Sequence, residues 1–140
     1  LMAKLNIAST STDADFAVKL IDVYPADFVP KEKKEGVIYN NYHQMVRSEV
    51  MPARFRTSFE IPEALPPNQT TEVYIRLQDV MHTFKKGHKI KIQIQSTWYP
   101  MIAVNPQKFL DNQYIAKKED YTKAFIKIFN DSHIEVEVLK

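Results

Sequence analysis

A two-residue alternation of apolar and polar side chains recurs along this chain and constrains its fold more than any other feature. The clearest run covers residues 89–95 (KIKIQIQ), where three isoleucines alternate with lysine and glutamine. Residues two apart share one face of a β-strand, whereas a helix repeats every 3.6 residues, so this run predicts a half-buried strand. The alternation returns at residues 3–8, 72–77 and 133–139. The sequence therefore predicts an all-β domain.

Two further runs are apolar on both faces, at residues 16–24 (FAVKLIDVY) and 124–129 (AFIKIF). Such runs are typical of strands that are covered on both sides. Residues 44–50 form a weaker candidate strand, and prolines and polar turns separate all these runs. Lys86 and Gly87 predict a tight turn, and Asn105-Pro106 predicts the start of a single helical turn. Seven or eight strands with long connections predict a β-sandwich with Greek-key or jelly-roll connectivity.

Length and composition place the whole chain, residues 1–140, in one globular domain. The chain is 44% hydrophobic and has no cysteine, so a core without disulfides or cysteine-bound zinc is expected. The formal net charge is +2, and the clusters of basic residues are short, most of them next to acidic residues. This pattern predicts no nucleic-acid partner. No apolar run approaches the roughly 18 residues of a membrane span, so no membrane partner is expected.

The motifs that usually carry catalysis or metal binding are missing from the sequence. An acyl-transfer serine needs a G-x-S-x-G turn, and neither Gly36 nor Gly87 has a serine neighbour. The histidines at positions 43, 82, 88 and 133 lack metal-ligand spacing, and solvated or hydrogen-bonded histidines at strand ends are the favoured interpretation. Asp13 and Asp15 precede an expected strand, where a turn is favoured over a calcium site. We therefore expect no catalytic residue, cofactor or metal in this chain.

Aromatic side chains next to the clearest strand are candidates for recognition. Trp98 and Tyr99 follow the run 89–95 and precede Pro100, while Tyr42 lies in a loop. Aromatic rings at such positions on a β-sandwich can pack a loop, fill a protein interface or stack on sugar rings. Loop packing or an interface is favoured, and a carbohydrate-binding module is the alternative.

Several segments together resemble one family of hydrolases. They are STDADFAVKLIDVYP at residues 11–25, YHQMVRSEV at 42–50, DVMHTFKKGHKI at 79–90 and QIQSTWYP at 93–100. In order and spacing they resemble the C-terminal region shared by X-Pro dipeptidyl-peptidases, cocaine esterase, α-amino acid ester hydrolases and glutaryl-7-aminocephalosporanic acid acylases. The similarity is closest to the ester hydrolase and acylase branch, and it covers nearly the whole chain.

This resemblance implies an accessory role and a more specific fold. The family's C-terminal region is a jelly-roll β-sandwich of the galactose-binding-domain type. It packs on an upstream α/β-hydrolase domain of the same parent chain, which holds the catalytic serine, aspartate and histidine. Weak candidates for the interface or pocket rim are Tyr42, His43, His82, Trp98 and Tyr99.

The same resemblance carries expectations about the parent chain. The family's jelly roll begins earlier than Leu1, so one or more strands are expected upstream of this chain. An exported or periplasmic bacterial parent, and association between copies of it, are further expectations.

Overall fold

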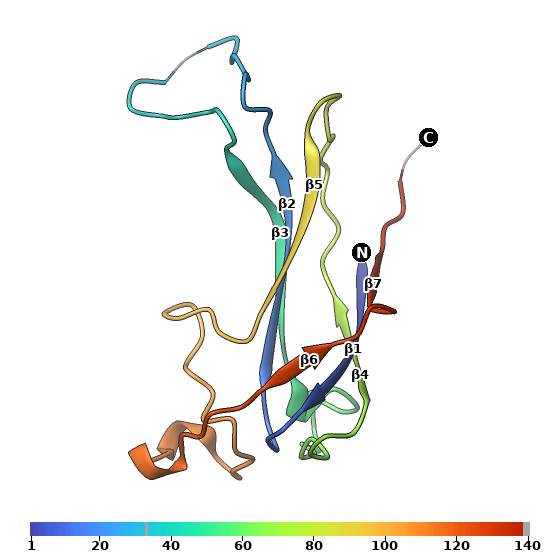
Figure 1. Ribbon diagram of the computed structural model, residues 1–140, viewed down its shortest axis with the longest axis vertical. Helices are drawn as coiled ribbons and strands as arrows, with labels where there is room; N and C mark the ends of the chain where they lie inside the picture. Colours follow the sequence, from blue (N-terminus) through green and yellow to red (C-terminus); the bar gives the residue numbers. More distant parts are fainter. Residues whose placement is uncertain (33, 139–140) are drawn as a thin grey trace.

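Within residues 1–32 and 34–138, which the computed structural model describes, seven strands form two antiparallel sheets (Figure 1). The first sheet has the order β4 (Thr71–Arg76), β1 (Met2–Ser9) and β6 (Ile126–Ile128), with β7 (His133–Glu135) also paired to β1. The second has the order β3 (His43–Pro52), β2 (Asp15–Val23) and β5 (Lys89–Gln95). The described residues contain short 3-10 turns but no α-helix: η1 (Ala53–Phe55), η2 (Gln113–Ile115) and η3 (Lys118–Asp120).

The two sheets confirm the predicted all-β sandwich, and the jelly-roll winding stays a prediction. No helix in the described part of the chain is long and apolar enough to cross a bilayer.

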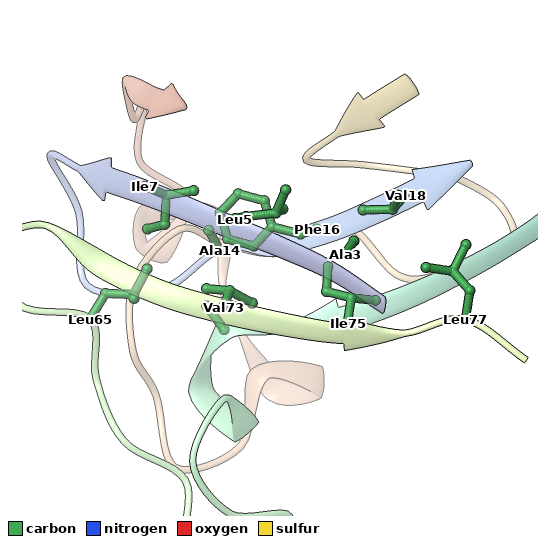
Figure 2. Close-up of a cluster of buried hydrophobic side chains, with 11 residues drawn as sticks. Ala3, Leu5, Ile7, Ala14, Phe16, Val18, Leu65, Val73, Ile75 and Leu77 are labelled. Atoms are coloured by element: carbon green, nitrogen blue, oxygen red, sulfur yellow. The ribbon is translucent and has the colours of Figure 1, made fainter. Parts of the chain in front are cut away.

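The core lies between β1, β2 and β4, and it follows from the alternation in the sequence (Figure 2). Leu5 and Ile7 on β1 face the same interior as Val73 and Ile75 on β4, and Phe16 on β2 closes it from the other sheet. Each of these five side chains is at most 2% exposed. Burying such a side chain stabilises the fold by roughly 1.5–3 kcal/mol, so these positions hold the sandwich together.

The two runs that are apolar on both faces have different outcomes. β2 is the central strand of its sheet, and Ala17 and Ile21 are buried as well as Phe16, which confirms the prediction. The prediction for residues 124–129 is wrong, because only Ile126–Ile128 is a strand and Phe125 and Ile128 are 65% and 43% exposed. The physical reason is position, since β6 lies at a sheet edge with β1 as its strand partner.

β6 and β7 pair with successive parts of β1, and a turn separates them. The turn is closed by the Ser132 amide, which donates to the Phe129 carbonyl at 3.1 Å, and by the Asn6 amide, which donates to Ser132 Oγ at 3.0 Å. β7 ends at Glu135, which is paired with Met2 at the start of β1. The strand is therefore shorter than the predicted run 133–139, because its pairing with β1 ends at Met2; Leu139 lies outside the described residues.

The two predicted turns also differ in outcome. Gly87 has a φ of 90°, and the His88 amide donates to the Lys85 carbonyl at 3.0 Å, as expected for a tight turn. The predicted helical turn at Asn105 is wrong. Asn105 Oδ1 accepts a hydrogen bond of 2.7 Å from the Gln107 amide, as a helix cap would, but Gln107 has a φ of 62°, outside the right-handed helical region, so no helical turn follows.

Candidate docking surface

The connection between β5 and β6, residues 96–125, is here called the docking loop. A buried ion pair anchors it to the sandwich. Arg54 Nε and Nη2 donate to Asp13 Oδ2 at 3.0 and 2.6 Å, and both side chains are buried. Arg54 Nη1 donates to the Leu110 carbonyl at 2.8 Å, and its guanidinium lies 4.7 Å from the centre of the Phe109 ring. One arginine therefore fixes the middle of the loop to the segment before β2.

Further hydrogen bonds hold the docking loop against the same segment. Asn105 Nδ2 donates to Asp15 Oδ1 at 3.0 Å, and the Phe109 amide donates to Thr12 Oγ1 at 2.9 Å. Burial raises the pKa of the Asp15 carboxyl to about 6, while the bond from Asn105 opposes that rise. These contacts give the loop a defined backbone although it contains only two single turns of 3-10 helix.

Several large apolar side chains of the docking loop point to solvent even though its backbone is anchored. The exposed fractions are 73% for Tyr99, 71% for Met101, 79% for Tyr114 and 73% for Ile115. Large exposed apolar side chains that gather on one segment are candidates for an interaction site. Figure 1 shows the loop at one end of the sheets, opposite the connection between β2 and β3. The docking loop thus combines an anchored backbone with exposed apolar side chains.

The five residues singled out from the sequence do not form one site. Trp98 and Tyr99 lie at the start of the docking loop, and Lys19 Nζ lies 3.7 Å from the centre of the Trp98 ring. Tyr42 and His43 lie where the chain enters β3, at the end of β2, because His43 pairs with Val23. Tyr42 is 45% exposed, and its ring meets that of Tyr24 edge-on at 5.7 Å.

His82 belongs to a third arrangement, a buried group that we call the Asp22 clasp. Asp22 is 2% exposed, and its two carboxylate oxygens lie 2.9 Å from His82 Nε2 and 2.8 Å from His88 Nδ1. The rings of Tyr24 and Phe28 pack against His88 at 4.6 and 5.6 Å between centres. The clasp joins the connection between β4 and β5 to the C-terminal end of β2. Its geometry therefore indicates a structural role.

Sequence reasoning expected solvated or hydrogen-bonded histidines and did not find the partner of His82 and His88, because Asp22 lies about sixty residues away in the chain. One signal was available: Asp22 is the acidic residue in a run that, apart from Lys19, is apolar on both faces, and a buried carboxylate needs donors.

The acidic residues before β2 are held by protein donors. Asp13 Oδ1 accepts from the Ala14 amide at 3.0 Å, as in a local turn, and Oδ2 accepts from Arg54. In residues 1–32 and 34–138, no three His, Cys, Asp or Glu side chains are grouped so that they could hold a metal ion.

The chain matches one family of known protein domains. The model of the X-Pro dipeptidyl-peptidase C-terminal non-catalytic domain matches residues 1–125. The chain belongs to this family. Members of the X-Pro dipeptidyl-peptidase C-terminal family are non-catalytic parts of hydrolases, so this chain alone is not a catalyst.

Individual relatives agree with the family. The chain is 28% identical to cocaine esterase of Rhodococcus sp. (strain MB1 Bresler) over 98 residues, and this alignment covers 70% of the chain. A solved aminopeptidase from a marine sediment Thaumarchaeota archaeon superposes with a TM-score of 0.83 and 37% identity over 91% of this chain. A solved α-amino acid ester hydrolase gives a TM-score of 0.83 and 33% identity over 92%. These matches confirm the resemblance inferred from the sequence motifs.

The chain spans only a small part of these relatives. It covers 15% of the cocaine esterase and 20% of each solved chain. Domains of this family therefore occur within much longer proteins.

Proposed function

We propose that this chain is the accessory domain of a longer hydrolase and that its docking loop packs on the catalytic domain, forming part of the wall of the substrate pocket. The observation that carries the proposal is the combination of an anchored backbone with outward-facing Tyr99, Met101, Tyr114 and Ile115. The parent would be a serine hydrolase acting on peptides, amides or esters. Support for this comes from the hydrolases and the aminopeptidase among the relatives.

The energetics favour a docking role for these side chains. Burying one large apolar side chain is worth roughly 1.5–3 kcal/mol, and aromatic side chains are enriched at interface hot spots. Arg54 and Asn105 fix the loop in advance, so little backbone entropy is lost on contact. A free, flexible loop with the same side chains would bind more weakly.

The test uses the intact parent enzyme. Exchanging both Tyr99 and Tyr114 for serine removes two exposed rings, and neither side chain is buried in the sandwich. In this double variant, we expect the catalytic and accessory domains to unfold at separate temperatures. We also expect its kcat/KM for an aminoacyl ester to fall at least about tenfold relative to the native enzyme. Tyr74→Ser, at an exposed tyrosine on β4, is the matched control and should change neither quantity. Unchanged unfolding and unchanged kcat/KM in the double variant would contradict the proposal.

The alternative, a sugar-binding module, finds less support in the geometry. Sugar stacking needs a free aromatic face, and Lys19 Nζ lies over the ring of Trp98 at 3.7 Å. In the proposed role, Trp98→Ala weakens docking or stability, and no sugar affinity exists to be lost. A glycan-binding screen of the native chain and this variant distinguishes the two functions.

A further inference from the structure

A second loop with exposed apolar side chains follows the 3-10 turn η1. We call residues 57–64 the Arg56 loop. Its side chains of Phe59 and Ile61 are 77% and 67% exposed, and the Phe59 ring is stacked on that of Phe55 with 6.5 Å between the ring centres. Figure 1 shows the Arg56 loop at the same end of the sheets as the docking loop, opposite the β2–β3 connection. The exposed apolar side chains at this end therefore come from two loops.

The backbone of the Arg56 loop is fixed by the arginine that precedes it. Arg56 Nη1 donates to the Glu63 carbonyl at 2.8 Å, and its Nη2 donates to the Ala64 carbonyl at 3.1 Å. Within the loop, Ser58 Oγ accepts a hydrogen bond of 3.2 Å from the Ile61 amide. Because the backbone is already held, little conformational entropy is lost when a partner covers the loop.

Arg54 binds both loops at once. Its carbonyl accepts a hydrogen bond of 2.8 Å from the Glu63 amide in the Arg56 loop, while its Nη1 donates to the Leu110 carbonyl in the docking loop at 2.8 Å. Arg54 is 4% exposed and is paired with Asp13, so it is itself held in the interior. The two loops therefore share one buried attachment point.

Thr12 is a second shared attachment point. Its carbonyl accepts from the Leu65 amide, directly after the Arg56 loop, at 2.8 Å. Its Oγ1 accepts from the Phe109 amide in the docking loop at 2.9 Å. Leu65 is 2% exposed, so the end of the Arg56 loop is fixed in the core. Two attachment points hold the loops in a defined position relative to each other.

We infer that the Arg56 loop is the second half of the docking surface, and that Phe59 and Ile61 contact the same catalytic domain as the docking loop does. This inference rests on the proposed function, and it assigns a partner to two side chains that the proposed function leaves exposed. A specific interface usually involves roughly 20–30 residues on each partner, more than the exposed side chains of the docking loop supply. A neighbouring loop that is held by the same buried residues extends the surface without any rearrangement.

A second copy of this chain fits the Arg56 loop less well than the catalytic domain. The charged residues of the loop are Glu60 and Glu63, so face-to-face pairing of two copies would bring carboxylates together, and like charges repel. A second copy on Phe59 would also compete for space with the domain that covers the docking loop, because Arg54 and Thr12 hold the two loops side by side.

The experiment is site-specific photo-cross-linking in the full-length parent. The photoreactive amino acid p-benzoylphenylalanine replaces Phe59 in the Arg56 loop or Tyr99 in the docking loop. The matched control position is Val29, which is 75% exposed in the β2–β3 connection at the opposite end of the sheets. After irradiation, mass spectrometry identifies the linked peptides, and the intact mass separates links within one molecule from links between copies. We expect residues 59 and 99 to link to the catalytic domain of the same molecule, and residue 29 to give no such link.

Every other result at residue 59 overturns the inference: a link between two copies, a link only within the accessory domain, or no link. A link from residue 29 to the catalytic domain as strong as that from residue 59 overturns it as well, because the contact would not be specific to this surface. If the change at Phe59 prevents folding, Ile61 is the second position.

Failure of this inference is distinguishable from failure of the proposed function. If residue 99 links to the catalytic domain and residue 59 does not, the docking loop keeps its role and the Arg56 loop has none. If neither residue links to the catalytic domain, the proposed function and this inference are both contradicted.

Discussion

The Arg54–Asp13 pair is the residue-level contact on which the docking loop depends most. Both side chains are buried, and the same guanidinium also binds the Leu110 carbonyl. Removing one member of a buried pair leaves an uncompensated charge, so Arg54→Ala should lower the free energy of unfolding by about 3–5 kcal/mol. Urea unfolding measures this change. Lys4→Ala, which removes the surface pair with Glu72, is the control and should have little effect. Equal effects of the two substitutions would contradict the assigned role.

Asp15 should make stability depend on pH. Burial raises its folded-state pKa from 3.8 to about 6, so between these values the folded chain binds more protons than the unfolded chain. The free energy of unfolding therefore falls as pH rises from about 4 to 6 and is then constant, with a total loss of at most about 3 kcal/mol. Asp15→Asn keeps an oxygen that can accept the bond from Asn105, and it should remove this slope.

Urea unfolding between pH 4 and pH 7 checks the prediction for Asp15. Asp111→Asn, at an exposed carboxyl, is the matched control, and its free energy of unfolding should depend on pH as that of the native chain does. A slope in Asp15→Asn that equals that of the native chain would show that another group is responsible.

Sequence reasoning is weakest for such residue-level contacts. Asp13 and Asp15 were recognised as turn residues, and Asp13 does bind the following amide. Their partners Arg54 and Asn105 are distant in the chain, and only the fold brings them together. A local pattern can indicate that a buried carboxylate needs a donor, but it cannot say which donor supplies it.

At the level of elements, the Asp22 clasp connects two parts of the fold that share no strand pairing. Asp22→Ala leaves His82 and His88 without their acceptor, and should lower the free energy of unfolding by about 1–3 kcal/mol. Amide hydrogen exchange in residues 77–88 should become faster, while exchange in β1 and β4 stays slow. His133→Ala, at a half-exposed histidine on β7, is the control. Unchanged exchange in residues 77–88 would show that the clasp does not hold this segment.

The strands themselves were the most predictable feature, because side-chain alternation reports directly on a two-residue period. All seven predicted runs contain a strand, and the central position of β2 follows from its two apolar faces. The predicted burial of apolar side chains fails at β6, beyond the end of β7, and at Ile90 and Ile92 of β5, because these side chains are exposed. An alternating pattern says which side chains share a face, whereas burial of that face depends on a neighbouring strand.

At the scale of the whole molecule, the exposed apolar side chains of the docking loop fit the proposed accessory role. They lie on a domain that belongs to a family found in longer hydrolases, and we propose that a catalytic domain covers them. The sequence motifs identified the family, because long segments match it in order. Of the proposed docking surface, the sequence singled out Tyr99 alone, because Met101, Tyr114 and Ile115 look like ordinary loop residues until their exposure and the anchoring of the backbone are known.

The most direct test of the central claim is reconstitution of the parent from two parts. The upstream hydrolase portion is expressed alone, this 140-residue chain is added, and hydrolysis of an aminoacyl ester and the thermal stability of the hydrolase portion are followed. An accessory docking domain should raise the activity or the stability on mixing, and the variant with Tyr99→Ser and Tyr114→Ser should raise them less. If both parts are folded and mixing changes neither quantity, the docking account is contradicted.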